Sequence, residues 1–200
     1  MPRAKAGASF RAVAAEDRAE LLTLLRRLSV RFGEFTLASG RTSDFYVDVK
    51  QTVLLPRGAE LLGDALLEAL RSRAAAPRAV AGVELGGVPL CTAVSLASAR
   101  DGGLPLPALV VRKQPKGHGT SSAVEGMGNV PAGADVVVVE DTVTSGGSGV
   151  KALGHLREAG LNPVLVVAVV DRGEGGARAF EAAGVPYLPL FRRADLEQST

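Results

Sequence analysis

One stretch of the chain has the residue types and spacing for phosphate and sugar chemistry. It reads Val-Val-Val-Val-Glu-Asp over residues 136–141 and continues through hydroxyl residues and two glycines to Ser148. Successive backbone N–H groups of a glycine-rich turn at a helix start form an anion-binding concavity, which suits a phosphate monoester. Carboxylates would repel that phosphate, so Glu140 and Asp141 suit ribose hydroxyls or a hydrated Mg2+. Together they describe a ribose 5-phosphate site, with an ordinary strand-turn-helix connection as the alternative.

Hydrophobic spacing predicts the elements that position this stretch. Four consecutive valines with no polar face favour a strand that is buried on both sides in a parallel sheet. We expect this strand to end on Glu140 and Asp141. Apolar residues then recur at helical spacing at Val150, Leu153 and Leu156, which predicts a helix after the loop. The loop has neither the Gly-Lys-Ser/Thr of a P-loop nor the G-x-G-x-x-G of a dinucleotide fingerprint.

The composition is that of a globular protein. With 200 residues, 46% hydrophobic and 22% charged, the chain fits one domain of ordinary size, residues 1–200. A net charge of +2 is too balanced to indicate a nucleic-acid or membrane surface. Cys91 is the single cysteine, which excludes a disulfide framework and fits a reducing compartment. The sequence shows no secretory signal and no membrane-length apolar run, so a cytoplasmic location is the default expectation.

Strands and helices alternate along the chain, which predicts an α/β fold with a central parallel sheet. The predicted helices span residues 16–31, 56–72 and 177–183, and a further helix ends near residue 99. The other predicted strands span residues 79–83, 108–111, 163–170 and 187–190. Residues 1–15 are expected to form a flexible tail. The segment 32–50 does not follow this alternation of strands and helices. It has two short β-like pieces around a Ser-Gly-Arg turn, which predict a hairpin.

Two further features carry positive charge. Residues 112–128 are polar and glycine-rich, and a structureless loop of that length in a compact domain is usually functional or mobile. Its basic residues concentrate positive potential, although a solvated basic loop is the alternative. Arg172 follows the second apolar strand, where an arginine facing the crevice can pair bidentately with a carboxylate. An ion pair with Asp171 or Glu174 is the alternative there.

Several motifs carry a resemblance to a known family. The run Val-Val-Val-Val-Glu-Asp-Thr-Val-Thr-Ser-Gly-Gly-Ser resembles the phosphoribosyl pyrophosphate signature of type I phosphoribosyltransferases. The segment F-T-L-x-S-G-x-x-S-x-x-Y-x-D resembles the N-terminal hood of orotate phosphoribosyltransferases, and Arg-Lys-x-x-Lys-x-His-Gly resembles their catalytic loop. The resemblance implies their fold, a parallel sheet flanked by helices with a small β hood. It also implies their reaction in UMP biosynthesis, in which orotate and phosphoribosyl pyrophosphate give orotidine 5′-monophosphate and pyrophosphate.

The resemblance also implies roles for individual residues. The implied catalytic residues are Lys116, His118 and Asp141. The implied phosphoribosyl pyrophosphate-binding residues are Arg112, Lys113, Lys116, His118, Glu140, Asp141, Thr142, Val143, Thr144, Ser145, Gly146, Gly147 and Ser148. The implied orotate-binding residues are Thr144, Arg172, Phe45 and Tyr46. Some family members carry lysine where Ala38 and Gly86 stand here.

The implied cofactor is Mg2+, which the substrate mainly carries, with no direct protein ligand and a water-mediated contact to Asp141 left open. The family also implies a homodimer in which the mobile loop, residues 112–128, reaches the neighbouring subunit's active site. No nucleic acid or membrane partner is expected.

Two other functions remain open at this stage. Another base-specific phosphoribosyltransferase would share residues 140–148 but should lack the hood and the Arg-Lys-x-x-Lys-x-His loop. A non-catalytic regulator that senses phosphoribosyl pyrophosphate usually needs a fused DNA-binding module. The residues before Phe32 are expected to form one helix and a tail, which is too little for such a module.

Overall fold

A six-stranded sheet forms the centre of the computed structural model, which describes residues 12–36, 42–73, 76–100, 104–114 and 123–197. The strand order is β5-β4-β3-β6-β7-β8. These strands are β3 (Ala79–Val83), β4 (Ala108–Val111), β5 (Val124–Glu125), β6 (Asp135–Val143), β7 (Asn162–Asp171) and β8 (Tyr187–Arg192). All neighbouring pairs are parallel except β4 and β5, which are antiparallel. The predicted parallel α/β sheet is therefore confirmed, with one antiparallel edge strand added.

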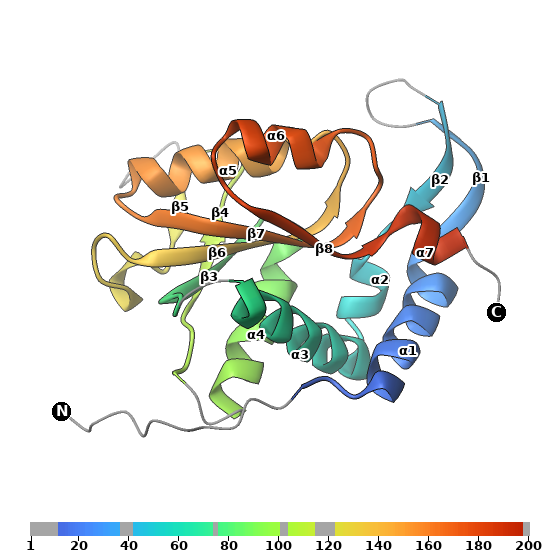
Figure 1. Cartoon of the computed structure of the whole chain (residues 1–200), viewed down its shortest axis with the longest axis horizontal. Helices are drawn as coiled ribbons and strands as arrows, with labels where there is room; N and C mark the ends of the chain where they lie inside the picture. Colours follow the sequence, from blue (N-terminus) through green and yellow to red (C-terminus); the bar gives the residue numbers. More distant parts are fainter. Residues whose placement is uncertain (1–11, 37–41, 74–75, 101–103, 115–122, 198–200) are drawn as a thin grey trace.

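Helices cover both faces of this sheet (Figure 1). The helices are α1 (Ala15–Leu24), α2 (Lys50–Val53), α3 (Pro56–Arg73), α4 (Gly87–Arg100), α5 (Gly147–Glu158), α6 (Gly176–Ala182) and α7 (Arg193–Glu197). Along β6, Val136 and Val138 belong to the core beneath α5 and α6, while Val137 and Val139 belong to the core with α1, α3 and α4. Because all four valines are fully buried, the apolar run has the two-sided burial that the sequence predicts.

The chain changes direction between β3 and β6. These two strands are parallel neighbours, with Gly82 opposite Val139. From β3 the chain passes through α4 to β4 on one side, and from β6 it passes through α5 to β7 on the other. In doubly wound sheets, ligands bind outside the carboxyl ends of the strands at such a reversal. The fold therefore points to the carboxyl ends of β3 and β6 as the place for a site.

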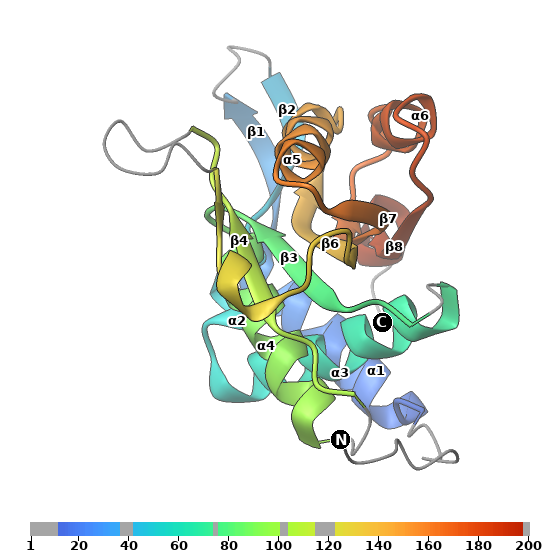
Figure 2. The same ribbon diagram turned by 90° about the vertical axis from the view of Figure 1, so that its left-hand side faces the viewer.

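The predicted hairpin forms a separate two-stranded sheet, the hood. Its strands are β1 (Val30–Thr36) and β2 (Thr42–Val47), which pair antiparallel with a register shift between Phe32 and Phe35. Figures 1 and 2 show this sheet standing outside the six-stranded one. The predicted Ser-Gly-Arg turn, which includes residues 39–41, lies outside the described residues.

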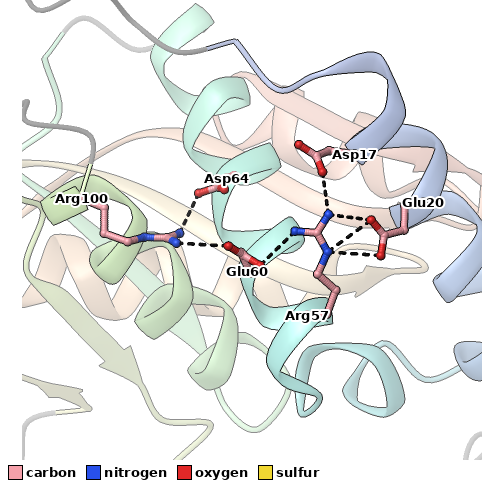
Figure 3. Close-up of polar contacts among 6 residues, drawn as sticks. All are labelled: Asp17, Glu20, Arg57, Glu60, Asp64 and Arg100. Carbon is pink, nitrogen blue, oxygen red and sulfur yellow. Dashed lines mark hydrogen bonds and ion pairs between the residues drawn. The ribbon is translucent and has the colours of Figure 1, made fainter.

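A network of charged side chains joins three helices on the side of the sheet that α3 and α4 cover (Figure 3). Arg57 of α3 pairs with Asp17 at 2.6 Å and with Glu20 at 2.6 Å, both from α1, and with Glu60 at 2.9 Å. Arg100 of α4 extends the network to Glu60 and Asp64. Because these side chains are largely exposed, each pair contributes little stability, and the network chiefly fixes how α1 lies on α3.

The structure differs from the sequence prediction at three element boundaries. The first helix continues past α1 as a π-helical turn, Leu25–Ser29, and stops there, so its predicted extension to Arg31 is wrong. Val30 instead begins β1 and pairs with Val47 of the hood. At the amino end this helix begins at Ala15, and the amide of Val13 donates to Glu68. The flexible tail stays a prediction. Residues 1–11 lie outside the described part.

The predicted loop 112–128 is also shorter than the sequence suggested. Val124 and Glu125 form β5 against the edge of β4, and a 3-10 turn follows at Met127–Asn129. Residues 115–122 lie outside the described part of the chain. The third difference is at β6, which continues through Glu140 and Asp141 to Val143 because Thr142 and Val143 still pair with β7. The loop before α5 therefore begins at Thr144.

Among the described residues, no helix combines the length and apolar character needed to cross a membrane.

Candidate functional site

The two acids of β6 point to opposite faces of the sheet, because successive strand residues alternate. Glu140 is only 6% exposed, and a Cβ built on Gly149 of α5 would lie 3.1 Å from its Oε1 atom. Asp141 faces the turn between β3 and α4, where a Cβ on Gly86 would overlap its carboxylate. One carboxylate therefore lies beneath the start of α5, and the other lies against the turn between β3 and α4.

Burial changes the chemistry of Glu140. Desolvation, with a smaller contribution from the charge of Asp141, raises the pKa of Glu140 to about 8, while Lys113 acts in the opposite direction. A carboxyl group that is held neutral in the free protein can exchange a hydrogen bond with a hydroxyl group of a ligand, whereas a nearby cation would favour its ionised form. A titratable group perturbed in this way beside a crevice is typical of functional sites.

The loop Thr144–Gly146 places open backbone amides at the start of α5. Gly146 caps the helix with φ of 80°, and the carbonyl of Thr144 accepts the amide of Gly176 at 3.0 Å. The first amides of a helix have no intrahelical acceptor. Ser145, Gly147 and Ser148 are exposed at this end. The arrangement is an anion-binding helix start of the kind that the sequence predicted.

Close packing behind this loop explains two of its glycines. A Cβ on Gly149 would lie 2.6 Å from the ring of Phe180, and one on Gly146 would lie 3.0 Å from the Cβ of Ala179. Residue 146 also has the positive φ that glycine adopts readily. These contacts fix α5 against α6, so the loop is held from behind and its amides stay directed outward.

Arg172 joins the sheet to the hood. Its Nη2 atom donates to Ser43 Oγ at 2.8 Å and to the carbonyl of Phe45 at 3.2 Å, and it lies 3.0 Å from Glu174 Oε1. The residue is 9% exposed. The ion pair with Glu174 that the sequence left open is therefore present, but it is mostly buried. Asp171, the other alternative partner, accepts the amide of Gly173 instead.

The two aromatic residues predicted to contact a base differ in exposure. The side chain of Phe45 is fully buried, with the Arg172 guanidinium 5.8 Å from its ring centroid. Tyr46 is 41% exposed and pairs with Phe35 at a centroid distance of 5.5 Å. Since neighbours on a strand point to opposite sides, the Tyr46 ring remains partly exposed while Phe45 supports the hood from within.

The base of the basic loop is held at the sheet edge. Arg112 donates its amide to the carbonyl of Ala123, and its guanidinium lies 3.5 Å from Glu125. The amide of Lys113 donates to Glu84 at 2.5 Å, while its side chain is exposed. The other predicted loop residues, Lys116 and His118, lie outside the described residues, as does Ala38.

One basic residue near the site was missed at the sequence level. Lys50, the first residue of α2, pairs with Asp48 at 2.5 Å. The hydrogen bond to Asp48 raises the pKa of Lys50, and the negative charge of Asp141 adds to this effect. Its position two residues after the hood motif is the only signal that the sequence offered.

The donor set around Asp141 bears on the expected magnesium ion. Within the described residues no group of three His, Cys, Asp or Glu side chains could hold a metal. Mg2+ prefers octahedral oxygen coordination and keeps several waters, so a single protein carboxylate fits an ion that arrives with substrate phosphates. The magnesium ion carried by the substrate stays a prediction.

Comparison with known proteins gives a consistent family. The model of the phosphoribosyl transferase domain matches residues 51–180. A curated orotate phosphoribosyltransferase of Sorangium cellulosum (strain So ce56) is 50% identical over 186 residues, which cover 92% of this chain and 95% of that protein. One of Thermosynechococcus vestitus is 49% identical over 183 residues, covering 92% and 94% of the two chains.

Solved structures agree with these matches. The Mycobacterium tuberculosis H37Rv orotate phosphoribosyltransferase in complex with Fe(III) dicitrate is 41% identical, covers 91% of this chain and 99% of its own, and gives a TM-score of 0.78. The same enzyme in complex with 5-phospho-alpha-D-ribosyl 1-diphosphate gives 0.74 at 37% identity, with coverage of 91% and 99%.

Proposed function

Because this chain belongs to the phosphoribosyl transferase family, and within it to the orotate phosphoribosyltransferases, we propose the following reaction and site. The 5-phosphoribosyl group moves from phosphoribosyl pyrophosphate to orotate, giving orotidine 5′-monophosphate and pyrophosphate in pyrimidine biosynthesis. One observation carries the proposal: the carboxyl ends of the neighbouring strands β6 and β7 carry two acids, an open helix start and Arg172, and Arg172 contacts the hood.

The 5-phosphate binds at the start of α5. The first amides of the helix donate to it, and the hydroxyls of Thr144, Ser145 and Ser148 add donors from the loop. Glu140 and Asp141 hold the ribose hydroxyls. Glu140 already lies beneath the start of α5, and Asp141 lies against the turn between β3 and α4. Mg2+ supplies charge neutralisation on the pyrophosphate, and Asp141 would hold it through water.

The base lies under the hood. Arg172 pairs with the orotate carboxylate, since a guanidinium forms two parallel hydrogen bonds with such a group. Tyr46 provides the exposed ring face, and Thr144 lies next to both the phosphate and the base. Phe45 acts through its backbone and through its packing against Arg172, because its side chain has no exposed surface.

Charge changes during the reaction define the remaining roles. As the bond from C1 to the pyrophosphate oxygen breaks, positive charge grows on the ribose and negative charge grows on the leaving group. Arg112 and Lys113 at the base of the loop, with Lys116 and His118 beyond it, stabilise the leaving group. Holding both substrates in line supplies much of the rate enhancement. In the proposed homodimer, this loop serves the site of the neighbouring subunit.

The comparisons with known proteins give less support to the two alternative functions. The adenine phosphoribosyltransferase of Leishmania donovani matches at 17% identity with a TM-score of 0.66, which is a likeness of fold alone. A phosphoribosyl pyrophosphate-sensing regulator has no support among the relatives described above. The cytoplasmic location stays a prediction.

The proposal is tested by pyrophosphate release from the purified protein with phosphoribosyl pyrophosphate, Mg2+ and one base at a time. We expect release with orotate and none above background with adenine or hypoxanthine. Release with a purine and none with orotate would replace the proposal with the purine alternative. Tight phosphoribosyl pyrophosphate binding without turnover of any base would favour the regulator.

A further inference from the structure

We propose that Glu174 sets the affinity of the site for anionic bases, because its carboxylate occupies the Arg172 guanidinium in the free protein and the carboxylate of the base must displace it. The inference rests on the proposed function and deepens the role of Arg172 in it. Glu174 then acts as an internal competitor of the substrate for the same cation.

The positions of the two residues fit this exchange. Glu174 Oε1 lies 3.0 Å from Arg172 Nη2, and the exposed fractions of the two side chains are 27% and 7%. The cation is therefore buried, and its anionic partner reaches it from the solvent side. Gly173 and Gly175 flank Glu174 with φ values of 76° and 103°, so the short turn can fold its side chain back onto β7.

The hydrogen bonds of Arg172 are unevenly distributed. Its Nη2 atom, which carries two hydrogens, faces three acceptors: Ser43 Oγ, the Phe45 carbonyl and Glu174 Oε1. Its Nε atom is buried and has no hydrogen-bond partner in the described part of the chain. A carboxylate that binds a guanidinium bidentately uses two nitrogens at once. Glu174 thus leaves the guanidinium incompletely satisfied, and an incoming carboxylate can bind it better.

The hood contacts keep Arg172 in place when Glu174 leaves. Ser43 Oγ and the Phe45 carbonyl hold the guanidinium, and Ser43 is itself fixed by a hydrogen bond with the same carbonyl at 2.9 Å. Two carboxylates beside one guanidinium repel each other, so Glu174 opposes the binding of orotate and of its nucleotide product. It has no such effect on a base that lacks a carboxylate.

The test compares the binding of orotate and of uracil, which lacks the carboxylate, to the wild type, to Glu174→Gln and to Glu181→Gln. Glutamine keeps the size of the side chain and one acceptor oxygen but removes the charge, and Glu181 is an exposed residue of α6 that gives a matched loss of charge. We expect Glu174→Gln to lower the Kd of orotate about five- to tenfold. This effect lies between those expected for losing a buried ion pair and for losing an exposed one. Uracil affinity should not change, and Glu181→Gln should behave as the wild type.

The readout is the ratio of the affinity for orotate to the affinity for uracil. A change in the amount of folded protein affects both affinities equally and does not change this ratio. The KM of orotate should fall with it while the KM of phosphoribosyl pyrophosphate stays constant. Weaker orotate binding in Glu174→Gln would show that Glu174 positions Arg172 and does not compete. An equal change for orotate and uracil would also overturn the inference. Failure of the wild type to bind orotate would remove the proposed function itself, which is a distinguishable result.

Discussion

At the scale of single residues, the site combines groups that are unfavourable for the free protein. Glu140 is a buried carboxyl group that directly follows the four valines of β6, and burial raises its pKa to about 8 from an ordinary value of 4.5. Asp141 lies against Gly86 with no room for a side chain between them. The burial of Glu140 is explained if the substrate supplies its partner, since functional sites often reduce stability.

Glu140→Gln should raise stability in a manner that depends on pH. Below about pH 4.5 the carboxyl is protonated in both the folded and the unfolded chain, so the substitution should change little. As pH rises from 4.5 to 8, the unfolded chain ionises while the folded protein keeps its proton, and Glu140 becomes progressively destabilising. The gain from glutamine should therefore grow to about 2–4 kcal/mol near pH 8 and then level off.

Denaturant unfolding of both proteins between pH 4.5 and 9 measures this difference. A gain that is the same at every pH would mean that Glu140 ionises normally in the folded protein. Binding of phosphoribosyl pyrophosphate to the variant provides the second readout, and it should weaken even where the variant is the more stable protein.

Gly86→Ala should reduce turnover because the new methyl group requires Asp141 to move. The added Cβ would lie 2.9 Å from the Cβ of Asp141 and would overlap its carboxylate, so rotation of the side chain alone cannot relieve the contact. We expect kcat to fall by about tenfold or more, as misplaced catalytic groups usually cause. Gly154→Ala is the matched control, since a Cβ at this position of α5 meets nothing within 4 Å. Equal activity of the two variants would remove Asp141 from the reaction.

At the scale of elements, the hood is held over the sheet from two directions. Arg172 reaches it from β7, and Arg193 of α7 pairs with Asp44 at 2.7 Å and lies 5.1 Å from the centroid of the Phe45 ring. A second ion pair with Glu197 fixes Arg193 within its own helix. The last helix of the described chain therefore helps to position the base site.

Arg193→Ala should loosen the hood and raise the KM of orotate, while the KM of phosphoribosyl pyrophosphate changes little. Because Asp44 is largely exposed, we expect roughly a threefold effect. Arg178→Ala, at an exposed position of α6, is the control for the loss of one positive charge. A similar rise in both KM values would indicate a general loss of structure.

The sequence predicted those elements whose pattern is local. The valine runs of β6 and β7 and the apolar face of α3 determine their own structure, and the predicted bounds of β3 and β4 are confirmed. The two-residue strand β5 forms only because the edge of β4 is available, so it has no signal of its own. The five-residue helix α7 also lacks a signal in the sequence, because it is too short to show a helical period.

The site was predictable in part. The loop before α5 follows from its glycines and hydroxyls, and Arg172 follows from its place after a strand. To predict that Glu140 and Asp141 point to opposite faces, one must know that both lie inside β6. The sequence placed the end of the strand at the acids, whereas it lies at Val143. The burial of Phe45 and the approach of Lys50 to Asp141 depend on how the hood packs on the sheet. This packing is a tertiary property that local sequence patterns do not determine.

At the scale of the whole molecule, the basic loop begins near the edge of the sheet, although the charge of Lys113 at its base still acts on Glu140. It leaves the sheet at the end of β4, and β3 separates β4 from β6. The proposed homodimer, in which each loop serves the neighbouring site, gives this position at the sheet edge a function. Each dimer would then contain two composite sites.

Mixing two inactive variants tests that assembly. Lys116→Ala removes the loop lysine and Asp141→Asn removes a carboxylate of the site. If the loop acts in trans, a mixed dimer carries both defects in one site and leaves the other intact, so about a quarter of the wild-type activity should return after full random exchange. Absence of recovery, with exchange demonstrated by differently tagged chains, would mean that each loop serves its own subunit.

A crystal structure of the protein with orotidine 5′-monophosphate tests the central claim most directly, because this one ligand carries the phosphate, the ribose and the base carboxylate. The account predicts the phosphate on the amides at the start of α5, the ribose hydroxyls beside Asp141, and the carboxylate about 3 Å from the Arg172 guanidinium. Glu174 should then lie away from Arg172. A phosphate bound at the turn between β3 and α4, or a base whose carboxylate does not reach Arg172, would contradict it.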